Sequence, residues 1–487
     1  MSRRLTALLL IALLALVAGC GGGDDEGGSA GDLGDSLGYL PKDAPLVGTF
    51  DSDVDSQQYK NLDRLLSKFP FGGQVKNQIK QAIDEEGADY EKDVKPLLGG
   101  ELVIGATDAR TLVDDSAPDQ YVFAYTASGG DLKEAVGKDS SYKEAGQLEG
   151  GTLFESTEDR TVVVVKGDTM VGAESRAGVQ AAFDRHDGDD KLTEEDFNGA
   201  FQDLPANPIM RIYGDAQALL EADPEAAEAR KVKWVAGLRK FGVTVNAEGD
   251  GLALDAHLST EGVAAADLPI AGGDQSPALA RFSDYSFAQR NLSQSWNFIV
   301  SVAAATDAKG FKDYQQDKER ANKDLGIDVD RDFIAQFTGD TTFAGGLDGS
   351  WSLRSAVKDP AAMRDTVEKL GKSGGTRDLK LTPAGDLVLA DDGEDRAFFG
   401  MVDEVFVAGL TPDAARQIAT VEPRPVRGTK GSMVFVADGE QIAKQILERR
   451  GQGGGAAGLF TGPIGDLTAY VSAAPDGMRA RAKLKIE

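Results

Sequence analysis

Residues 326–332 read Gly-Ile-Asp-Val-Asp-Arg-Asp, and residues 87–93 read Gly-Ala-Asp-Tyr-Glu-Lys-Asp. Both stretches begin with glycine and carry acidic residues at alternate positions. After a one-residue slip, the similarity continues, and Gly99, Val103, Gly105 and Asp108 meet Gly339, Phe343, Gly345 and Asp348. Self-similarity of this kind controls the whole fold assignment, because it predicts that one folding unit occurs twice.

The order of the predicted elements also matches between the two halves. A strand pattern with a turn at Gly167-Asp168 leads into a helix capped by Ser175, and its counterpart leads into a helix capped by Thr411. Each half closes with a hairpin, which turns at Asp250-Gly251 or at Asp476-Gly477. We therefore place the first copy at 39–262 and the second at 277–487. Residues 263–276, rich in Ala, Gly, Asp and Pro, are predicted to form a linker or long loop.

Short strands of alternating polarity follow one another through turns within each copy. Amphipathic helices are expected between them, because apolar residues recur at helical spacing. One such stripe is Leu62, Leu65, Leu66 and Phe69, and another is Val232, Val235, Leu238 and Phe241. This order predicts an α+β fold, in which mainly antiparallel sheets have helices packed on one face. The sequence leaves open whether the two copies share one sheet.

The first twenty residues resemble the leader of an exported protein. Arg3 and Arg4 precede an apolar run from Leu5 to Ala18, which is too short to span a bilayer of roughly 20 helical residues. Residues 1–19 are therefore predicted to be a signal peptide. The tetrad Val17, Ala18, Gly19 and Cys20 resembles a bacterial lipobox, and the resemblance implies cleavage before Cys20 and acylation of its thiol and new N-terminus.

This resemblance implies a lipoprotein held by acyl chains such as palmitate on the extracytoplasmic face of a membrane, at the cell surface or in the periplasm. Residues 20–38 are mainly Gly, Asp, Ser and Ala, and they are predicted to be a flexible tether because they cannot bury a core. Two acyl chains give stable anchoring, whereas one gives only marginal binding.

The composition excludes several classes of function. With 52 Lys and Arg against 80 Asp and Glu, the net charge is −28, which repels nucleic acid and the surface of an anionic bilayer. Membrane attachment must therefore come from the acyl chains. Cys20 is the single cysteine, so disulfides, cysteine-rich zinc sites and a cysteine nucleophile are excluded. No cofactor is predicted.

Three further stretches resemble one family. They are Tyr-Leu-Pro-Lys-Asp-Ala-Pro-Leu-Val-Gly-Thr-Phe at 39–50, Glu-Lys-Asp-Val-Lys-Pro-Leu-Leu-Gly-Gly-Glu at 91–101 and Lys-Leu-Thr-Glu-Glu-Asp-Phe at 191–197. Together they are similar to the domain-of-unknown-function 3352 family of bacterial secreted and membrane-attached proteins. The second copy lacks the Leu-Pro opening and a clear Leu-Thr-Glu helix start. The resemblance implies a cell-envelope folding unit, and it brings no activity, cofactor or catalytic residue with it.

Asp328, Asp330 and Asp332 are weak candidates for a calcium site, because their spacing is that of the first ligands of a calcium loop. Phe333 stands where such a loop needs glycine, and Gly339 stands where it needs a bidentate glutamate. The alternative is that these acidic residues complement the N-terminus of a helix. A second loop, at 183–194, resembles an EF-hand less well, since Phe183 and Arg185 occupy ligand positions. We therefore predict no metal site.

Catalytic motifs do not appear in a suitable context. The two histidines, His186 and His257, have no evident serine partner, so a hydrolase is the least favoured function. An uncharged run from Trp296 to Val302 predicts a buried helix or, alternatively, the lining of a cavity for an acyl chain. The leading hypothesis is a non-enzymatic, membrane-anchored binding or scaffolding module with an unknown protein partner. A carrier of a lipid or other hydrophobic ligand is the alternative.

Overall fold

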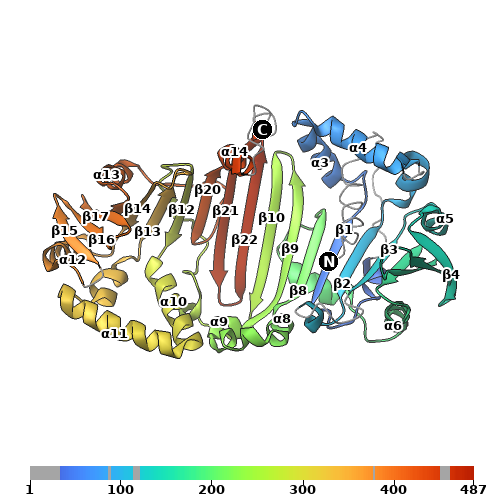
Figure 1. Ribbon diagram of the computed structural model, residues 1–487, viewed down its shortest axis with the longest axis horizontal. Coiled ribbons are helices and arrows are strands. Elements are labelled where there is room, and N and C mark those ends of the chain that lie inside the picture. The colour runs from blue at the N-terminus through green and yellow to red at the C-terminus, as the bar shows by residue number, and fades with distance from the viewer. Residues whose placement is uncertain (1–32, 86–88, 113–120, 377–378, 450–460) are drawn as a thin grey trace. The chain divides into compact units, whose positions relative to one another are not determined.

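The computed structural model describes residues 33–85, 89–112, 121–376, 379–449 and 461–487 (Figure 1). The chain divides into two units. Unit 1 holds the described part of Met1–Pro224 together with Arg239–Ser259 and Ile486–Glu487, and unit 2 holds Glu225–Leu238 and Thr260–Lys485. Each unit is thus built mainly from one half of the chain and completed by a short segment from elsewhere in the sequence.

An antiparallel sheet forms the centre of unit 1. Its strands are β1 (Leu46–Asp51), β2 (Glu101–Ala106), β3 (Tyr121–Thr126), β4 (Tyr142–Leu148), β5 (Gly151–Ser156), β6 (Val162–Lys166), β7 (Thr169–Ala173), β8 (Met210–Asp215), β9 (Leu238–Glu248) and β10 (Gly251–Thr260). The pairings give the spatial order β4-β5-β6-β7-β3-β2-β1-β8-β9-β10.

Antiparallel strands also form the centre of unit 2. Its strands are β12 (Tyr285–Arg290), β13 (Asp340–Gly345), β14 (Trp351–Ala356), β15 (Lys380–Ala384), β16 (Leu387–Asp391), β17 (Arg396–Val402), β18 (Val405–Gly409), β20 (Met433–Asp438), β21 (Ile464–Ala474) and β22 (Gly477–Ile486). Their order is β15-β16-β17-β18-β14-β13-β12-β20-β21-β22. Two short strands, β11 (Ala278–Leu279) and β19 (Arg424–Pro425), pair separately.

These sheets confirm the predicted α+β class with antiparallel strands. The two strand orders correspond strand for strand, from β4 and β15 at one end to β10 and β22 at the other. The descent of both units from one duplicated ancestor stays a prediction.

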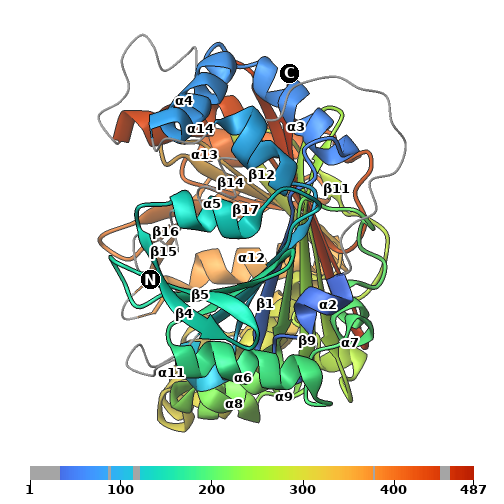
Figure 2. The ribbon, with the colours of Figure 1, turned by 90° about the vertical axis from the view of Figure 1, so that its right-hand side faces the viewer.

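The helices of unit 1 are α2 (Leu33–Leu37), α3 (Gln57–Ser67), α4 (Gly72–Glu85), α5 (Leu132–Lys138), α6 (Arg176–Asp187), α7 (Glu194–Asn198) and α8 (Ala216–Ala222). The sequence predicted that the helices pack on one face of the sheet. In the structure they pack on both faces. Helices α5 and α6 lie on opposite sides of the strands between them (Figure 2). On β6, Val163 and Val165 belong to the cluster around α5, whereas Val162 and Val164 belong to the cluster that contains α6 residues. Because successive strand residues point to opposite faces, both faces are covered, which explains the continuous valine run.

The helices of unit 2 are α9 (Lys233–Ala236), α10 (Leu292–Thr306), α11 (Ala308–Leu325), α12 (Pro360–Ser373), α13 (Pro412–Thr420) and α14 (Gly439–Arg449). Here too the helices cover both faces. Phe406 of β18 packs in a cluster with Met363 and Leu370 of α12, and the next residue, Val407, packs with Ile418 of α13. The reason is the same alternation of neighbouring side chains along one strand.

The structure removes the one-residue slip from the sequence comparison. Gly100, rather than Gly99, occupies the place of Gly339. A Cβ atom on Gly100 would lie 1.8 Å from the carbonyl oxygen of Thr126, and one on Gly339 would lie 2.6 Å from that of Ala356. Both glycines are therefore needed where the start of one strand approaches the end of the next.

Two predicted connecting segments contain helical residues and buried side chains. Of the predicted tether, residues 33–37 form α2, whose Leu33 and Leu37 lie four residues apart on one helix face and are buried in the core. The predicted linker at 263–276 carries one short helical turn, at Ala265–Asp267, and buries Leu268 and Ile270. Scattered apolar residues within polar stretches made both burials hard to foresee.

The predicted helical stripe from Val232 to Phe241 is wrong. Helix α9 covers only Lys233–Ala236, and strand β9 begins at Leu238. β9 pairs with β8 and β10, and these pairings override the local helical spacing of the apolar residues.

Candidate functional site

The predicted lipid attachment site lies outside the described residues. Cys20 and the preceding Val17, Ala18 and Gly19 belong to the range 1–32, so their role stays a prediction. Within the described ranges, no helix combines the length and the apolar character that crossing a membrane would require.

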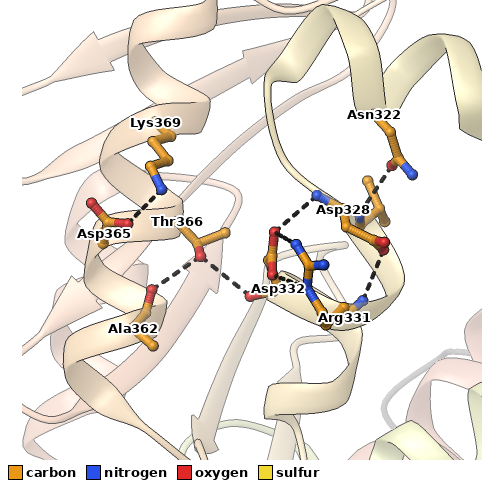
Figure 3. A network of polar contacts seen from close by, with 9 residues as sticks. Asn322, Asp328, Arg331, Asp332, Ala362, Asp365, Thr366 and Lys369 are labelled. Carbon is orange, nitrogen blue, oxygen red and sulfur yellow. Dashed lines mark hydrogen bonds and ion pairs between the residues drawn. The ribbon is translucent and has the colours of Figure 1, made fainter.

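The turn at Asp328, the weak calcium candidate, is a reciprocal helix cap (Figure 3). Gly326 ends α11 in the left-handed conformation, with a φ of 68°. Asp328 is extended, and its carboxylate accepts a hydrogen bond from the N–H of Arg331 at 3.1 Å, at the start of the π-helical turn Val329–Phe333. Asp332 reaches back, and its Oδ2 accepts the N–H of Asp328 at 2.9 Å. The Asp328 carboxylate therefore satisfies an N–H group within the turn, and the Asp332 carboxylate satisfies the N–H of Asp328, as in a capping box.

Basic side chains already compensate the carboxylates of this turn. Arg331 donates from Nε and Nη2 to Asp332 at 2.7 and 3.1 Å, and this pairing, with the backbone hydrogen bond from Asp328, lowers the pKa of Asp332 to about 2. Asp330 Oδ2 lies 2.6 Å from Lys318 Nζ of α11. A calcium ion needs several free oxygen ligands converging on one point. In the part of the chain that the structure describes, no group of three or more His, Cys, Asp or Glu side chains is placed to hold a metal ion.

Further contacts tie this turn to its neighbouring helices (Figure 3). Asn322 Oδ1 of α11 accepts the N–H of Val329 at 3.0 Å. The hydroxyl of Thr366 on α12 lies 3.3 Å from the carbonyl oxygen of Asp332 and 3.0 Å from that of Ala362, so it can donate to either. The network therefore connects α11, the π-helical turn and α12, and it has a structural role.

Unit 1 contains the same turn at Asp89. Asp89 Oδ1 accepts the N–H groups of Glu91 and Lys92 at 3.0 and 3.1 Å, and Asp93 Oδ2 accepts the N–H of Asp89 at 2.7 Å. Here too a π-helical turn follows, at Tyr90–Val94. The repeated acidic residues thus stabilise one local backbone conformation, which occurs in both units.

The two histidines lie in different elements. His186 belongs to α6, with its Nε2 2.9 Å from Asp35 Oδ1 of α2 and its ring stacked on Tyr39 at 4.3 Å between centroids. Burial, with the charges of Asp35 and Asp187, raises the pKa of Tyr39 to about 12. His257 lies in β10. The His186 contacts fasten α2 to α6, which is a structural arrangement, and Thr193 of the EF-hand-like loop caps α7.

The uncharged run from Trp296 to Val302 lies in α10 but is not buried. Every residue of α10, all of which are described, is at least partly exposed, and Ile299 is 57% exposed. The expectation of a buried helix is therefore wrong. The rings of Trp234 and Phe298 meet edge-on, with 6.1 Å between their centroids. Gln294 Nε2 lies within hydrogen-bond distance of the carbonyl oxygens of Ala265 and Ile270. These contacts hold α10 at its first turns and leave an apolar surface beyond them.

Sequence reasoning missed a polar cluster in the sheet of unit 2. Ser352 and Arg354 lie two residues apart on β14, and Thr342 lies opposite Arg354 on β13. Strand alternation places the three side chains on the face that α13 covers. The signal in the sequence was a single arginine within a strand of alternating pattern, which reads equally well as a residue on a solvent-facing side.

Comparison with known proteins identifies a family but no activity. A family model described as "Protein of unknown function (DUF3352)" matches residues 5–372. A search of curated proteins found no match. Among solved structures, crystal form III of TP0453 has a TM-score of 0.28 and 8% sequence identity, and the match covers 47% of this chain and 81% of that chain. Crystal form I of TP0453 gives 0.27 and 10%, with coverage of 48% and 81%. Both structural similarities are too low to carry an argument.

The family match, by contrast, extends over most of the chain. It runs through unit 1 and on into unit 2 as far as Lys372 in α12. It also includes the segments around Tyr39, Glu91 and Lys191 that carry the resemblance in the sequence. The chain therefore belongs to the DUF3352 family of proteins of unknown function.

Proposed function

We propose that this DUF3352 protein is an exported lipoprotein, anchored to a membrane through Cys20, whose two units form a non-enzymatic binding or scaffolding module. The observation that carries the proposal is the leader of residues 1–20. Two arginines, a short apolar run and small residues before the cysteine are the signals of export and cleavage. Cys20 is the single cysteine, so the chain offers one thiol for acylation.

The charge of the chain supports attachment by acyl chains rather than by the folded surface. A net charge of −28 opposes contact with an anionic bilayer, whereas each buried methylene of an acyl chain contributes about 0.8 kcal/mol to membrane binding. The units would then lie outside the membrane on the extracytoplasmic side, available to a partner.

A binding role is supported by what the conspicuous titratable groups do. Asp328 and Asp332 cap a turn, Asp330 pairs with Lys318, and His186 joins Asp35. These side chains serve the fold, so they are poor candidates for the acid, base or nucleophile of a hydrolase.

Acyl labelling of the full-length protein in its bacterial host tests the anchor. We expect a clickable palmitate analogue to label the wild type and to be lost in Cys20→Ala, with release of the protein from the membrane fraction. Ser29→Ala, in the same predicted tether, is the matched control and should keep both properties. Labelling and membrane retention of Cys20→Ala would refute the proposal.

A second candidate function, the carriage of a hydrophobic ligand, is favoured by α10. An uncharged helix with a 57% exposed isoleucine is unusual on a protein of this charge, and a bound apolar molecule would cover it. Mass spectrometry of organic extracts from the purified protein should then find a stoichiometric lipid. Ile299→Asp should reduce the amount of bound lipid. The control Lys312→Asp, at an exposed position on the neighbouring helix α11, should leave that amount unchanged. A clean extract from the wild type would remove this candidate.

A further inference from the structure

Arg354 is a half-buried cation that lacks a counterion among the described residues. It lies on β14 between Thr342 of β13 and Val407 of β18, and α13 packs over the same strands. In the described ranges, its buried Nε atom has no hydrogen-bond partner. Burial lowers the pKa of Arg354, and no neighbouring carboxylate acts in the opposite direction. In a chain with 80 acidic residues, an unpaired arginine in a sheet requires an explanation.

A second polar group beside it is also unsatisfied. Ser352 is 1% exposed, and its Oγ has no hydrogen-bond partner within the described ranges. Two residues apart on one strand, Ser352 and Arg354 point to the same face, roughly 7 Å from each other along the strand. Thr342, 2% exposed, uses its oxygen to accept the N–H of Ala280 at 3.2 Å, so its hydroxyl proton remains available to donate. The three side chains together present donors to one region.

The fold itself does not require polar residues at these positions. β1, β2 and the capped turn correspond at one constant offset to β12, β13 and their turn, so the paired residues can be matched between the units. In unit 2, Ser352 pairs with Ala344 and Gly409 on the two neighbouring strands. At the equivalent place in unit 1, Val122 pairs with Gly105 and Ala173. By the same register, Arg354 stands where unit 1 has Ala124, and Thr342 stands where it has Val103. All three unit 1 residues are buried and apolar.

The access to this face also differs between the units. In unit 1, α2 contacts β2 and β3, and its Leu37 belongs to the core cluster that contains Val122 and Ala124. In unit 2, the matching residues 272–276, all of them described, run without helical structure. Arg354 accordingly stays partly exposed, whereas Ala124 is 2% exposed.

From these observations we propose that the α13-covered face of unit 2 binds a carboxylate-bearing ligand with an apolar body. Arg354 forms an ion pair with the carboxylate, and the hydroxyl groups of Ser352 and Thr342 donate hydrogen bonds to it. A planar guanidinium matches a carboxylate through two parallel hydrogen bonds. One positive charge is neutralised by one carboxylate, whereas a phosphate dianion would leave excess negative charge in these surroundings. The neighbouring Val407, Leu387 and Ile418 belong to one core cluster and make the surroundings of these polar groups apolar. The inference deepens the proposed binding role and rests on it.

Octanoate is the probe for the test, with octan-1-ol and octyl phosphate as matched ligands that share its chain. We measure binding to the full-length protein by calorimetry at low ionic strength. Octanoate should bind the wild type and lose at least about tenfold in affinity in Arg354→Met, because a charge-assisted pair is removed. Ser352→Val should weaken binding by a smaller factor. Arg320→Met, which removes an exposed arginine of α11 paired with Asp317, should leave the affinity unchanged.

Three outcomes would overturn the proposal: no binding of octanoate to the wild type, equal binding of octanoate and octan-1-ol, or unchanged affinity in Arg354→Met. Tighter binding of octyl phosphate would also overturn it, in favour of a phosphate ligand. Arg354→Met should fold, since unit 1 has alanine at that position, and circular dichroism checks this.

The failure of this inference can be told apart from the failure of the proposed anchor. Arg354→Met should keep the palmitate label and the membrane attachment, and Cys20→Ala should keep the binding of octanoate.

Discussion

The two units share a strand order but differ in where they place charge. On the helix-covered face, unit 1 has Val122 and Ala124 where unit 2 has Ser352 and Arg354. At the end of the first strand the contrast is reversed, because Asp51 faces Glu101 in unit 1, whereas Arg290 pairs with Asp340 at 2.9 Å in unit 2. One topology therefore accommodates two facing acids in unit 1, where Arg211 lies 3.8 Å from Glu101, and in unit 2 an arginine, Arg354, whose buried Nε has no hydrogen-bond partner among the described residues.

The helical segment after the first strand differs as well. In unit 1, α3 buries Tyr59 and Leu65, and the Tyr59 hydroxyl donates to the carbonyl oxygen of Asp51 at 2.8 Å. In unit 2, α10 is uncharged, and none of its residues is buried. The same position in the chain thus supplies a piece of core in one unit and an apolar surface in the other.

The largest expected effect comes from α2, the helix that only unit 1 has over its apolar face. Leu37→Ala should reduce the free energy of unfolding by about 3 kcal/mol, since it leaves a cavity at a fully buried leucine. Trp234, Trp296 and Trp351 all lie in unit 2, so tryptophan fluorescence follows unit 2 while far-ultraviolet circular dichroism follows both.

We expect an early loss of circular dichroism in urea for this variant, with an unchanged fluorescence transition. The control Leu410→Ala, at a 40% exposed leucine, should shift stability by less than about 0.5 kcal/mol. An unchanged circular dichroism transition for Leu37→Ala would show that α2 contributes little to unit 1.

Making the two faces alike should stabilise unit 2. Arg354→Ala combined with Ser352→Val copies the residues of unit 1 and removes two unsatisfied groups, which should raise the free energy of unfolding by about 1 kcal/mol. The measurement is the urea midpoint from tryptophan fluorescence, with Arg320→Ala as the control. A lower midpoint would mean that the polar pair already has partners that stabilise it.

Asp51 makes the stability of unit 1 depend on pH. Burial, with the nearby charges of Asp53 and Glu101, raises the pKa of Asp51 to about 6. Because the folded-state pKa exceeds the unfolded value of about 3.9, this group's contribution is fully present below pH 4 and is lost as the pH rises through 6.

Asp51→Asn should therefore stabilise unit 1 at pH 7 by about 1 kcal/mol, a figure discounted for partial exposure, and should have little effect at pH 4. Circular dichroism in urea across this pH range provides the measurement. Asp43→Asn, at an exposed position, should show no such trend. Equal effects of Asp51→Asn at both pH values would contradict the assignment.

The smallest effect concerns the two capped turns. The hydrogen bonds from Arg331 contribute most to the low pKa of Asp332, so Arg331→Ala should move that pKa upward from about 2 toward 3.9 with little change in stability. Nuclear magnetic resonance titration of the carboxyl carbon measures the shift. In unit 1, Lys92 pairs with Asp89 rather than with Asp93, so Lys92→Ala is the comparison, with a smaller expected shift at Asp93. A fixed Asp332 pKa would assign the depression to the backbone hydrogen bond instead.

Local patterns predicted the class and several element boundaries. Ser175 and Thr411 cap their helices as expected, and Pro412 takes the first turn of α13, because capping depends on neighbouring backbone groups alone. The exposure of α10 and the coverage of both sheet faces were not predicted, since an apolar residue reads the same whether it packs on a sheet or faces solvent.

The polar sites were the least predictable part of the molecule. The interpretation that Asp328 and Asp332 complement the N-terminus of a helix agrees with the contacts, in which both residues cap a helical turn, because their spacing is local. The meeting of His186 with Asp35, and of Arg354 with Thr342, depends on strand order and on residues far apart in the chain. Periodicity within one segment cannot provide such information.

Unit 1 is closed by a residue from the far end of the sequence. Ile486 is buried, its N–H donates to the carbonyl oxygen of Asp250 at 2.8 Å, and its own carbonyl accepts from Lys68 Nζ at 2.5 Å, across a separation of 418 residues. Contacts between residues so far apart in the sequence can form only after nearly the entire polypeptide has been made. Closing a loop of this length is also entropically costly. Dissecting the protein at the middle of the sequence would therefore yield a fragment of unit 1 with an incomplete edge, and synthesis of nearly the whole chain would have to finish before this unit could fold completely.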